Sequence, residues 1–409
     1  MRRRVFLKSG ALALVTIGLD PSFLRRTVYA QGALAPKKGK VLICLFQRGA
    51  ADGLNILVPH GEKEYYALRP TIGIPRQQVI DLDGFFGLHP SLAPLQPLWK
   101  SGMLAPVTAV GSPSSTRSHF DAQDFMETGT PDRKGTPDGW LNRLLAAEGT
   151  CAQCAVHASP FRAVAFSAQT PRILEGPQPT IAMSNLADFT IRATGDDVAR
   201  LEALYRTGNA DLIHGTGAET FDAVRMLKAA DPQHYAAEHG AEYPRSPFGQ
   251  SLRQIAQLIK ADVGLEIAFA DVGGWDTHVN QGASTGQLAQ RLADFAHAIA
   301  ALATDLGDRM EDVVILTMSE FGRMAKQNGS GGTDHGHAGM LFVIGGSAKG
   351  GKVHGTWPGL AKEQLYEGRD LALTTDFRAV FAEVVARHLG VADSSVVFPG
   401  FSPVGVGVV

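Results

Sequence analysis

The chain has 409 residues, of which 44% are hydrophobic, so it is long enough for one large globular domain or two smaller ones. A formal net charge of −2 at pH 7 gives no general attraction for nucleic acid or for an anionic membrane surface. We therefore expect no nucleic-acid partner, and any anion that the protein binds must be held by a local cluster of charge.

The first 30 residues have the pattern of a twin-arginine export signal. Basic residues at 2–8 precede a mildly apolar stretch at 11–19, and small residues occupy the cleavage positions of Val28-Tyr29-Ala30. The apolar stretch is too short to span a membrane. We predict that residues 1–30 are a signal peptide read by the twin-arginine export machinery. The mature chain is then periplasmic or secreted and has no stable membrane span.

Strand-like apolar runs alternate with helical patterns along the rest of the chain. The runs lie at 41–46, 104–110, 163–167, 265–271, 313–318 and 340–345. The clearest helix extends from about Gly286 to Leu306, with apolar residues three and four positions apart, and another extends from Asp376 to Leu389. This alternation predicts a layered α/β fold in which the helices cover a sheet.

A segment at about 180–250 interrupts this pattern and is richer in polar and charged residues. It has helical patterns at 196–206 and 218–230, and we predict a helical insertion or cap over the sheet.

The chain has three cysteines. Cys44 lies within an apolar run and is predicted to be a core residue. Cys151 and Cys154 are predicted to form a local disulfide or to remain two idle thiols.

Polar clusters follow several of the strand-like runs, where ligands of open α/β sheets bind. After the first run come Arg48 and Asp52, and Asp52 either contributes to a site or caps backbone amides. After the second run comes a loop that enters a helix with Arg117, Ser118 and His119. Ser118 is a candidate nucleophile or an ordinary N-cap, Arg117 a candidate anion clamp, and His119 a candidate proton carrier or ligand.

The remaining clusters are rich in metal-binding side chains. Asp276 and His278 alternate after the run at 265–271, so an extended loop directs them to the same side. Glu320 follows the run at 313–318, and a glycine-flanked loop supplies three more candidate ligands, which are Asp334, His335 and His337. Oxygen and imidazole ligands without thiolate suit Zn²⁺, Mn²⁺ or Fe better than Ca²⁺. Together with Asp52, these residues are the predicted ligands of a divalent metal ion.

At these residues the sequence resembles the family of exported bacterial proteins known as domain of unknown function 1501. The motifs that carry the resemblance are Arg48-Gly49-Ala50-Ala51-Asp52-Gly53, Arg117-Ser118-His119-Phe120-Asp121, Gly273-Gly274-Trp275-Asp276-Thr277-His278, Ser319-Glu320-Phe321-Gly322-Arg323 and Thr333-Asp334-His335-Gly336. The resemblance covers nearly all of the mature chain and implies one domain over residues 36–409. That family is related to the alkaline phosphatase and sulfatase superfamily.

This relationship implies an alkaline-phosphatase-like fold, a three-layer sandwich with a mostly parallel central sheet, and metal-assisted hydrolysis of phosphate or sulfate esters. In that superfamily one strand ends in Ser/Ala-Asp-His-Gly. Here Glu320 stands in place of the Asp and Phe321 in place of the His, so Asp334 or His335 must supply the missing ligand. Gln47 likewise stands where an Asp would follow the first strand, and Asp52 is displaced onward.

We therefore predict an exported metal-dependent hydrolase whose substrate is an anionic ester, either a small molecule or part of a polymer. Ser118 is the nucleophile implied by position, with Thr116 or a metal-bound hydroxide as alternatives, and Arg117 or Arg48 clamps the anion. Phe321 favours another hypothesis, an exported binding or assembly protein that retains the fold without catalysis.

Overall fold

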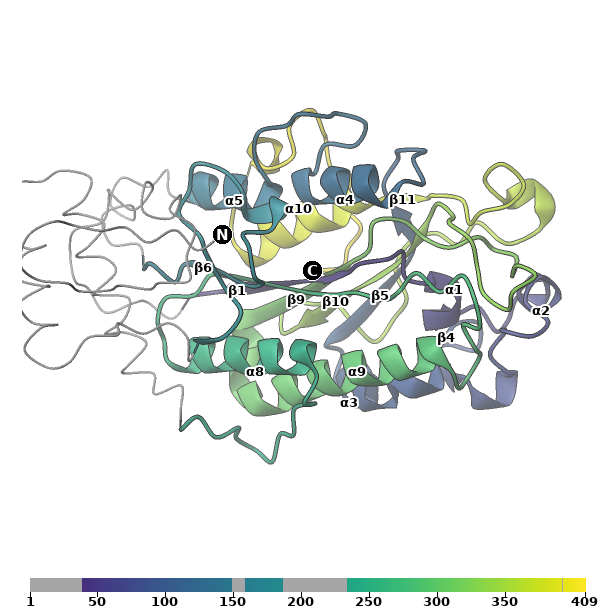
Figure 1. The fold of residues 1–409 in the computed structure, drawn as a ribbon, viewed down its shortest axis with the longest axis horizontal. Coiled ribbons are helices and arrows are strands. Elements are labelled where there is room, and N and C mark those ends of the chain that lie inside the picture. The colour runs from purple at the N-terminus through teal and green to yellow at the C-terminus, as the bar shows by residue number, and fades with distance from the viewer. Residues whose placement is uncertain (1–38, 149–158, 187–233, 392) are drawn as a thin grey trace, which may run out of the picture.

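The computed structural model describes residues 39–148, 159–186, 234–391 and 393–409. Within them an eight-stranded sheet has the order β11-β5-β10-β9-β1-β8-β6-β7 (Figure 1). The strands are β1 (Val41–Gln47), β5 (Leu104–Gly111), β6 (Ala163–Phe166), β7 (Ile181–Met183), β8 (Ile267–Val272), β9 (Val313–Met318), β10 (Gly339–Gly345) and β11 (Thr375–Asp376).

The central strands are continuous apolar runs because both of their faces are buried. In β1, Ile43 and Leu45 point into one core, whereas Cys44 and Phe46 point into the other. All seven residues of β1 are buried. Cys44 is fully buried, as its place in the run predicted, and burial raises the pKa of its thiol.

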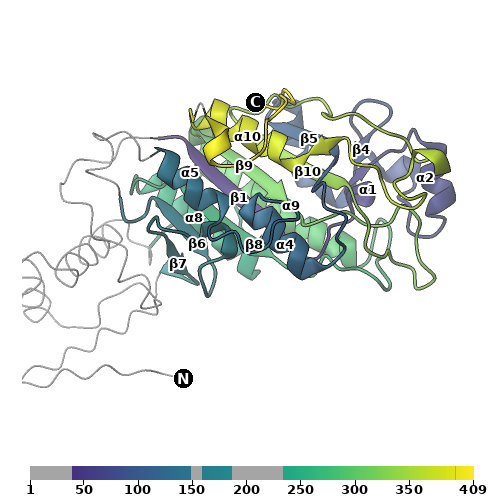
Figure 2. The ribbon, with the colours of Figure 1, turned by 90° about the horizontal axis from the view of Figure 1, so that it is seen from above.

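Helices cover both faces, which makes the three-layer sandwich that the resemblance implied (Figures 1 and 2). One face carries α3 (Gln96–Lys100), α8 (Pro247–Lys260) and α9 (Gln287–Leu306). The opposite face carries α4 (His119–Thr128), α5 (Trp140–Glu148) and α10 (Phe377–His388). Each long helix packs with one apolar stripe; in α9, Leu292, Phe295 and Ile299 are buried against the sheet. Each such side chain contributes about 1.5–3 kcal/mol of hydrophobic free energy.

Short elements gather at one end of the sheet, the end toward α1 and α2 in Figure 1. They include α1 (Gly53–Ile56), α2 (Lys63–Leu68) and a small antiparallel sheet of β2 (Leu57–Val58), β4 (Gly87–Leu88) and β3 (Ile80–Asp81). Short 3₁₀ helices complete the described chain at Arg76–Gln78, Pro90–Leu95, Arg172–Leu174, Gly307–Asp312, Lys362–Gln364 and Ser394–Val396.

Strand direction determines which loops meet at this end. The neighbours of β1, which are β8 and β9, run parallel to it, as do β6 with β8 and β7 with β6. β10 runs antiparallel to both of its neighbours, β5 and β9. The loop before β10 therefore reaches the same edge as the loops that follow β1, β5, β8 and β9. The sequence pattern predicts only that residues 332–338 precede a strand. The antiparallel direction of β10 is what brings them to the polar clusters that follow β1, β5, β8 and β9.

The six predicted strands and the two predicted helices begin and end within two residues of the observed elements. Gly286 and Asp376 are the N-caps of α9 and α10, and the Asp376 carboxylate accepts a hydrogen bond from Arg378 N. One boundary was wrong: Ile181–Met183, assigned to the insertion, is an edge strand of the main sheet because it pairs in parallel with β6.

Several predictions lie outside the described residues. They are the signal peptide, the Cys151 and Cys154 pair, and the helical patterns at 196–206 and 218–230. Among the residues that are described, none of the helices combines the length and the apolar composition needed to cross a membrane.

Candidate metal centre

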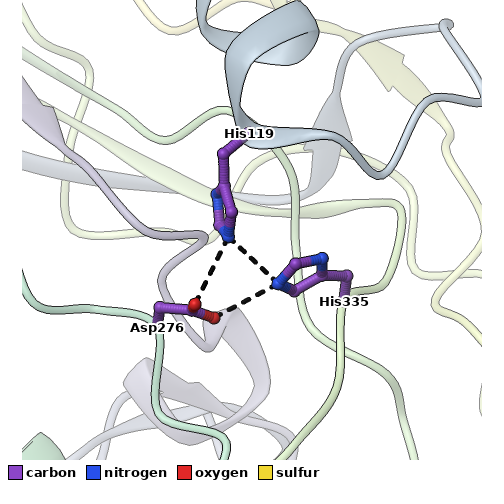
Figure 3. Close-up of side chains that lie close together, drawn as sticks. All are labelled: His119, Asp276 and His335. Carbon is purple, nitrogen blue, oxygen red and sulfur yellow. Dashed lines mark hydrogen bonds and ion pairs between the residues drawn. The ribbon is translucent and has the colours of Figure 1, made fainter.

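Two imidazoles and a carboxylate converge at the carboxyl edge of the sheet, and Figure 3 shows His119, Asp276 and His335 pointing toward one another. The Nε2 atoms of His119 and His335 are 3.0 Å apart. Asp276 places Oδ2 3.5 Å from His119 Nε2 and Oδ1 3.3 Å from His335 Nε2. Ligands of a tetrahedral zinc ion are separated by about 3.3 Å, given Zn–N and Zn–O bonds of about 2.0–2.1 Å. The two imidazole nitrogens and the carboxylate therefore have the spacing of a metal site.

The three residues come from distant parts of the chain. His119 is the first residue of α4, which follows β5, and Asp276 lies in the loop that follows β8. His335 lies in the loop that precedes the antiparallel β10. Backbone hydrogen bonds hold these loops together, because Thr333 N donates to Thr277 O and Met324 N donates to Asp334 O. The centre is thus supported by the ends of the sheet and by loop pairing.

Oxygen acceptors bind the outer nitrogens of both imidazoles. His119 Nδ1 lies 2.8 Å from Glu320 Oε1, and His335 Nδ1 lies 3.0 Å from the carbonyl oxygen of Arg117. Because a carboxylate or a carbonyl only accepts, both Nδ1 atoms carry the proton in the neutral rings. Each Nε2 then has a lone pair directed at the other. That arrangement needs a shared proton or a cation between them.

His278 adjoins this trio. Its Nε2 lies 3.0 Å from His335 Nε2 and 3.0 Å from Asp276 Oδ1. Its Nδ1 lies 3.0 Å from Asp334 Oδ1, a carboxylate that also accepts from Asn328 Nδ2 at 3.0 Å. These hydrogen bonds from Asn328 and His278 hold the pKa of Asp334 below its ordinary value. His278 is therefore the candidate fourth ligand, with Asp334 orienting its ring.

A buried guanidinium positions Asp276. Arg323 is 1% exposed, and its Nη1 donates to Asp276 Oδ1 while its Nε donates to Thr333 Oγ1 at 3.1 Å. Burial acts to raise the pKa of Asp276, but the hydrogen bond and charge of Arg323 outweigh burial and keep the pKa below its ordinary value. Asp276 is consequently ionised and is a candidate ligand.

Glu320 supports the centre from beneath His119. It is fully buried and accepts from Gly49 N and Gln123 Nε2, each at 2.9 Å, as well as from His119. Burial acts to raise its pKa, but the hydrogen bonds from His119 and Gln123 dominate and lower it. Glu320 thus contacts His119 Nδ1 as a buried anion, and it orients a ligand instead of pointing into the centre itself.

The two central histidines have opposite pKa shifts. The hydrogen bond to Glu320 raises the pKa of His119, whereas burial and then the charge of His119 lower that of His335. A proton between the two Nε2 atoms therefore belongs to His119. A cation that binds there replaces this proton.

The apolar ring of Phe321 lies beside the centre. It is 5% exposed, and its ring centroid lies 5.0 Å from that of His119 and 5.1 Å from that of His335. It packs with Ala50 and Ala122 in a small cluster of its own. Phe321 supplies no ligand atom, and the imidazoles of His119 and His335 both lie against its ring.

Two of the predicted ligands have other partners. Asp52 is fully buried and accepts hydrogen bonds at Oδ2 from Arg69 Nη1 and Gln281 Nε2, both at 2.6 Å. His337 is buried and stacks on Tyr366 with ring centroids 4.3 Å apart, and burial lowers its pKa. Neither residue belongs to the cluster of His119, Asp276 and His335.

The predicted nucleophile and anion clamps also have other partners. Ser118 is exposed and caps α4, since its Oγ accepts from Asp121 N at 3.5 Å. Arg117 Nη2 donates to Asp370 at 2.6 Å and to Glu367 at 2.7 Å. Thr116 Oγ1 accepts from Ser118 N at 3.2 Å.

Arg48 is similarly engaged, with its Nη1 donating to Glu127 at 2.8 Å and its Nε to Asp271 at 2.5 Å. No guanidinium of the two predicted clamps is thus left without a carboxylate in the described residues.

Sequence reasoning missed three residues that orient the centre. Arg323, Gln123 and Asn328 each donate a hydrogen bond to one of its carboxylates. Arg323 lies five residues after β9 ends, in the motif Ser319-Glu320-Phe321-Gly322-Arg323. Nothing in that motif indicated that its partner is Asp276. Gln123 and Asn328 had no signal in the sequence, because an amide side chain on a helix or in a loop is most often solvated.

The chain is similar in structure to the PsFucS1 sulfatase of Pseudoalteromonas sp., with 12% identity and a TM-score of 0.35 over 77% of this chain and 64% of the sulfatase. It is also similar to the lipoteichoic acid synthase LtaP of Listeria monocytogenes, with 10% identity and a TM-score of 0.31 over 79% of this chain and 71% of the synthase.

The chain thus spans just under two thirds of the length of the sulfatase. No curated protein matches the sequence. The model of one protein family, described as protein of unknown function (DUF1501), matches residues 39–399. The chain therefore belongs to the DUF1501 family.

Proposed function

We propose that this protein is a metal-dependent hydrolase of phosphate or sulfate esters. The observation that carries the proposal is the pair of imidazole Nε2 atoms 3.0 Å apart, both near one carboxylate and both with Nδ1 committed to oxygen. Such paired lone pairs repel unless a proton or a cation lies between them, and a divalent cation can replace the proton. Histidines oriented by a second hydrogen bond from Nδ1 are the common form of a protein metal ligand.

The ligand set indicates the kind of ion. His119, His335 and Asp276 offer two imidazole nitrogens and one carboxylate, and His278 offers a third nitrogen. This combination suits Zn²⁺, Mn²⁺ or Fe²⁺, whereas Ca²⁺ and Mg²⁺ favour oxygen ligands alone. A divalent cation bound there would activate water for attack and offset the charge that develops on the ester oxygens.

The residues of the chain have separate roles in this proposal. Glu320 and Arg323 keep His119 and Asp276 in place, so the ligands need little rearrangement when an ion or a substrate binds. Phe321 excludes water from one side of the centre. Since Ser118 is exposed and caps α4, water is the nucleophile that this geometry favours over the Ser118 hydroxyl.

The decisive experiment is the metal content per chain, measured by elemental mass spectrometry, for the protein and for His335→Ala. His297→Ala is the matched control, because His297 is exposed on α9 and its Nδ1 contacts only its own helix. We expect about one Zn, Mn or Fe per chain, retained in the control and lost in His335→Ala. The ion-loaded protein is then assayed against aryl phosphate and sulfate esters. Absence of metal after incubation with each ion would contradict the proposal.

A second function has one observation in its favour. Phe321 fills a position beside the centre with a ring that can neither bind an ion nor transfer a proton. An exported binding or assembly protein would retain such a centre for ligand binding alone. Stoichiometric metal without hydrolysis of any ester would support this second function.

We also propose export by the twin-arginine machinery, on the basis of the basic residues at 2–8 and the small residues at the cleavage positions. This pathway carries folded proteins, which suits a protein that acquires its ion before export. Replacement of Arg2, Arg3 and Arg4 by Lys is expected to retain the protein in the cytoplasm, as fractionation would show.

A further inference from the structure

Arg291 carries an uncompensated positive charge close to the candidate metal centre. It forms no ion pair or hydrogen bond with a carboxylate in the described residues, and its buried Nε has no acceptor there. A buried donor without an acceptor is costly, so such a group in a folded protein often has a ligand as its partner. The predicted clamps Arg48 and Arg117 differ, because each is bonded to two carboxylates. Of these three arginines, Arg291 is the one with the capacity to bind an anion.

The first turns of α9 bring Arg291 to the loop that carries Asp276. This helix begins at Gln287, after the loop that follows β8, so its first turns lie at the carboxyl edge of the sheet. Phe295 of the same helix meets Trp275 edge to face, with ring centroids 5.8 Å apart. Arg291 precedes Phe295 by four residues and therefore lies on the same face of α9, one turn nearer that edge.

The guanidinium rests on the backbone of Gly274, two residues before Asp276. A Cβ at position 274 would fall 2.4 Å from both Cζ and Nη1 of Arg291, so a glycine is needed for the guanidinium to lie there. Gly273 and Gly274 are both exposed, and a Cβ on Gly273 would meet no heavy atom within 4 Å outside its chain neighbours. The loop that supports the guanidinium thus borders open space. Because no hydrogen bond to a carboxylate holds it, the guanidinium can turn toward a ligand.

The charge balance of the loaded centre makes this guanidinium important. The carboxylates of the centre are those of Asp276, Glu320 and Asp334. Together with the guanidinium of Arg323 they leave two negative charges, which a divalent ion neutralises. Arg291 then gives the loaded centre a positive charge. The first turn of α9 contains no acidic side chain, so the partial positive charge of this helix end adds to that of Arg291.

We infer that Arg291 binds the tetrahedral oxyanion of the substrate, which is the phosphate or sulfate group of the ester. This inference rests on the proposed function for the identity of the ligand. The guanidinium donates to oxygens of that group, because its planar set of N–H donors matches the geometry of an oxyanion. The role of anion clamp, predicted for Arg117 or Arg48, thus belongs to a residue of α9.

The test uses inorganic phosphate and inorganic sulfate, because both share the tetrahedral oxyanion of the proposed substrates. Isothermal titration calorimetry of the metal-loaded protein and of Arg291→Met gives the dissociation constant for each oxyanion. Met removes the charge and retains an apolar side chain that packs on Gly274. We expect Arg291→Met to weaken the binding of at least one oxyanion by about tenfold or more, since charge-assisted hydrogen bonds are the stronger kind.

The control variants separate the charge from the fold. Arg387→Met removes an exposed positive charge from the last turn of α10 and should leave both dissociation constants unchanged. Arg291→Lys retains the charge without the planar donors, so it should lose less affinity than Arg291→Met does. The variants are compared at equal metal content and after urea unfolding has shown that they are folded. Arg291→Gln replaces Arg291→Met in this test if Met at this position prevents folding.

The same variants are assayed with p-nitrophenyl phosphate and p-nitrophenyl sulfate. Arg291→Met should lower kcat/KM by about tenfold or more for the ester whose oxyanion it binds more weakly. Equal oxyanion affinity in the protein and in Arg291→Met, or binding of neither oxyanion, would overturn the inference, whereas ester hydrolysis by the metal-loaded protein would still support the hydrolase. Oxyanion binding that depends on Arg291, without hydrolysis of any ester, would remove the hydrolase and support the anion site.

Discussion

The buried Glu320 carboxylate accepts a hydrogen bond from His119 Nδ1 at 2.8 Å, and this leaves His119 Nε2 facing His335 and Asp276. This hydrogen bond fixes the orientation of an imidazole at the start of a helix. Glu320 is in turn bound by a backbone N–H of Gly49 and by Gln123, so the orientation of His119 depends on three separate loops and helices.

Glu320→Gln is expected to weaken metal binding by about 10- to 100-fold, because second hydrogen bonds of this kind orient metal ligands. The dissociation constant would be measured by competition with a chromophoric chelator. Glu363→Gln is the matched control, since Glu363 is exposed and remote from His119 in the chain. An unchanged dissociation constant in Glu320→Gln would show that Glu320 does not position the ligand.

Ser118→Asn distinguishes a cap from a nucleophile. Asn caps helices about as well as Ser, so the variant should retain both the stability of α4 and any ester hydrolysis. Ser118→Ala should lose about 1 kcal/mol of stability and keep its activity. Activity is measured with the ion-loaded protein and stability by urea unfolding. Inactive but fully folded Ser118→Asn would instead establish the Ser118 hydroxyl as the nucleophile.

Arg69→Met is expected to destabilise the protein by about 3–5 kcal/mol, because it leaves the buried Asp52 carboxylate without its cation. The double variant Asp52→Leu with Arg69→Met should recover much of that loss, since neither charge remains. Denaturant midpoints would measure both effects. Metal content should stay the same in each variant, and a fall in the folded double variant would return Asp52 to the set of ligands.

His388 should make stability depend on pH. Burial lowers its pKa to about 4, and its Nε2 donates to Val41 O at 3.0 Å. At pH 7.5 both folded and unfolded states are neutral at this residue. As the pH falls from about 6.5 to about 4, the unfolded chain binds a proton that the folded chain excludes, and up to about 3 kcal/mol of stability is lost.

The check on His388 is urea unfolding of the protein and of His388→Gln between pH 7.5 and pH 4.5. The Gln variant should lose less stability over this interval, because it cannot bind the proton. His297→Gln, at an exposed histidine, should behave as the unaltered protein does. Equal pH dependence in all three proteins would contradict the assignment.

Asp305→Ala should loosen residues 235–243, the segment that packs on α8 and α9. The buried Asp305 carboxylate accepts from the hydroxyls of Tyr235 and Tyr243 at 2.6 and 2.8 Å and from Lys260 at 2.5 Å. Limited proteolysis should cut the variant faster near residues 235–243, while its metal content is unchanged. Asp308→Ala, in the 3₁₀ turn that follows α9, is the control. Equal cleavage rates would show that this contact does not hold the segment.

Local patterns in the sequence predicted most of the framework. Apolar runs such as 313–318 became strands at those same residues, and the spacing of Leu292, Phe295 and Ile299 predicted α9. These patterns predict helices and strands because each buried face needs apolar side chains at the period of its own element, independently of distant parts of the chain. They also identified His119, Asp276 and His335 as chemically important, although His119 was assigned to catalysis and the other two to metal binding.

The sequence by itself determined the layered α/β class, the main elements and the pool of Asp, Glu and His from which a site could form. Only the tertiary structure decided which of them meet. His119 and His335 are 216 residues apart in the chain, and their contact depends on the reversed direction of β10 and on its place between β5 and β9. Asp52 and His337 had equally suitable side chains, yet Arg69 and Tyr366 hold them elsewhere. Strand order and direction arise from packing between distant segments, so no local pattern of residues records them.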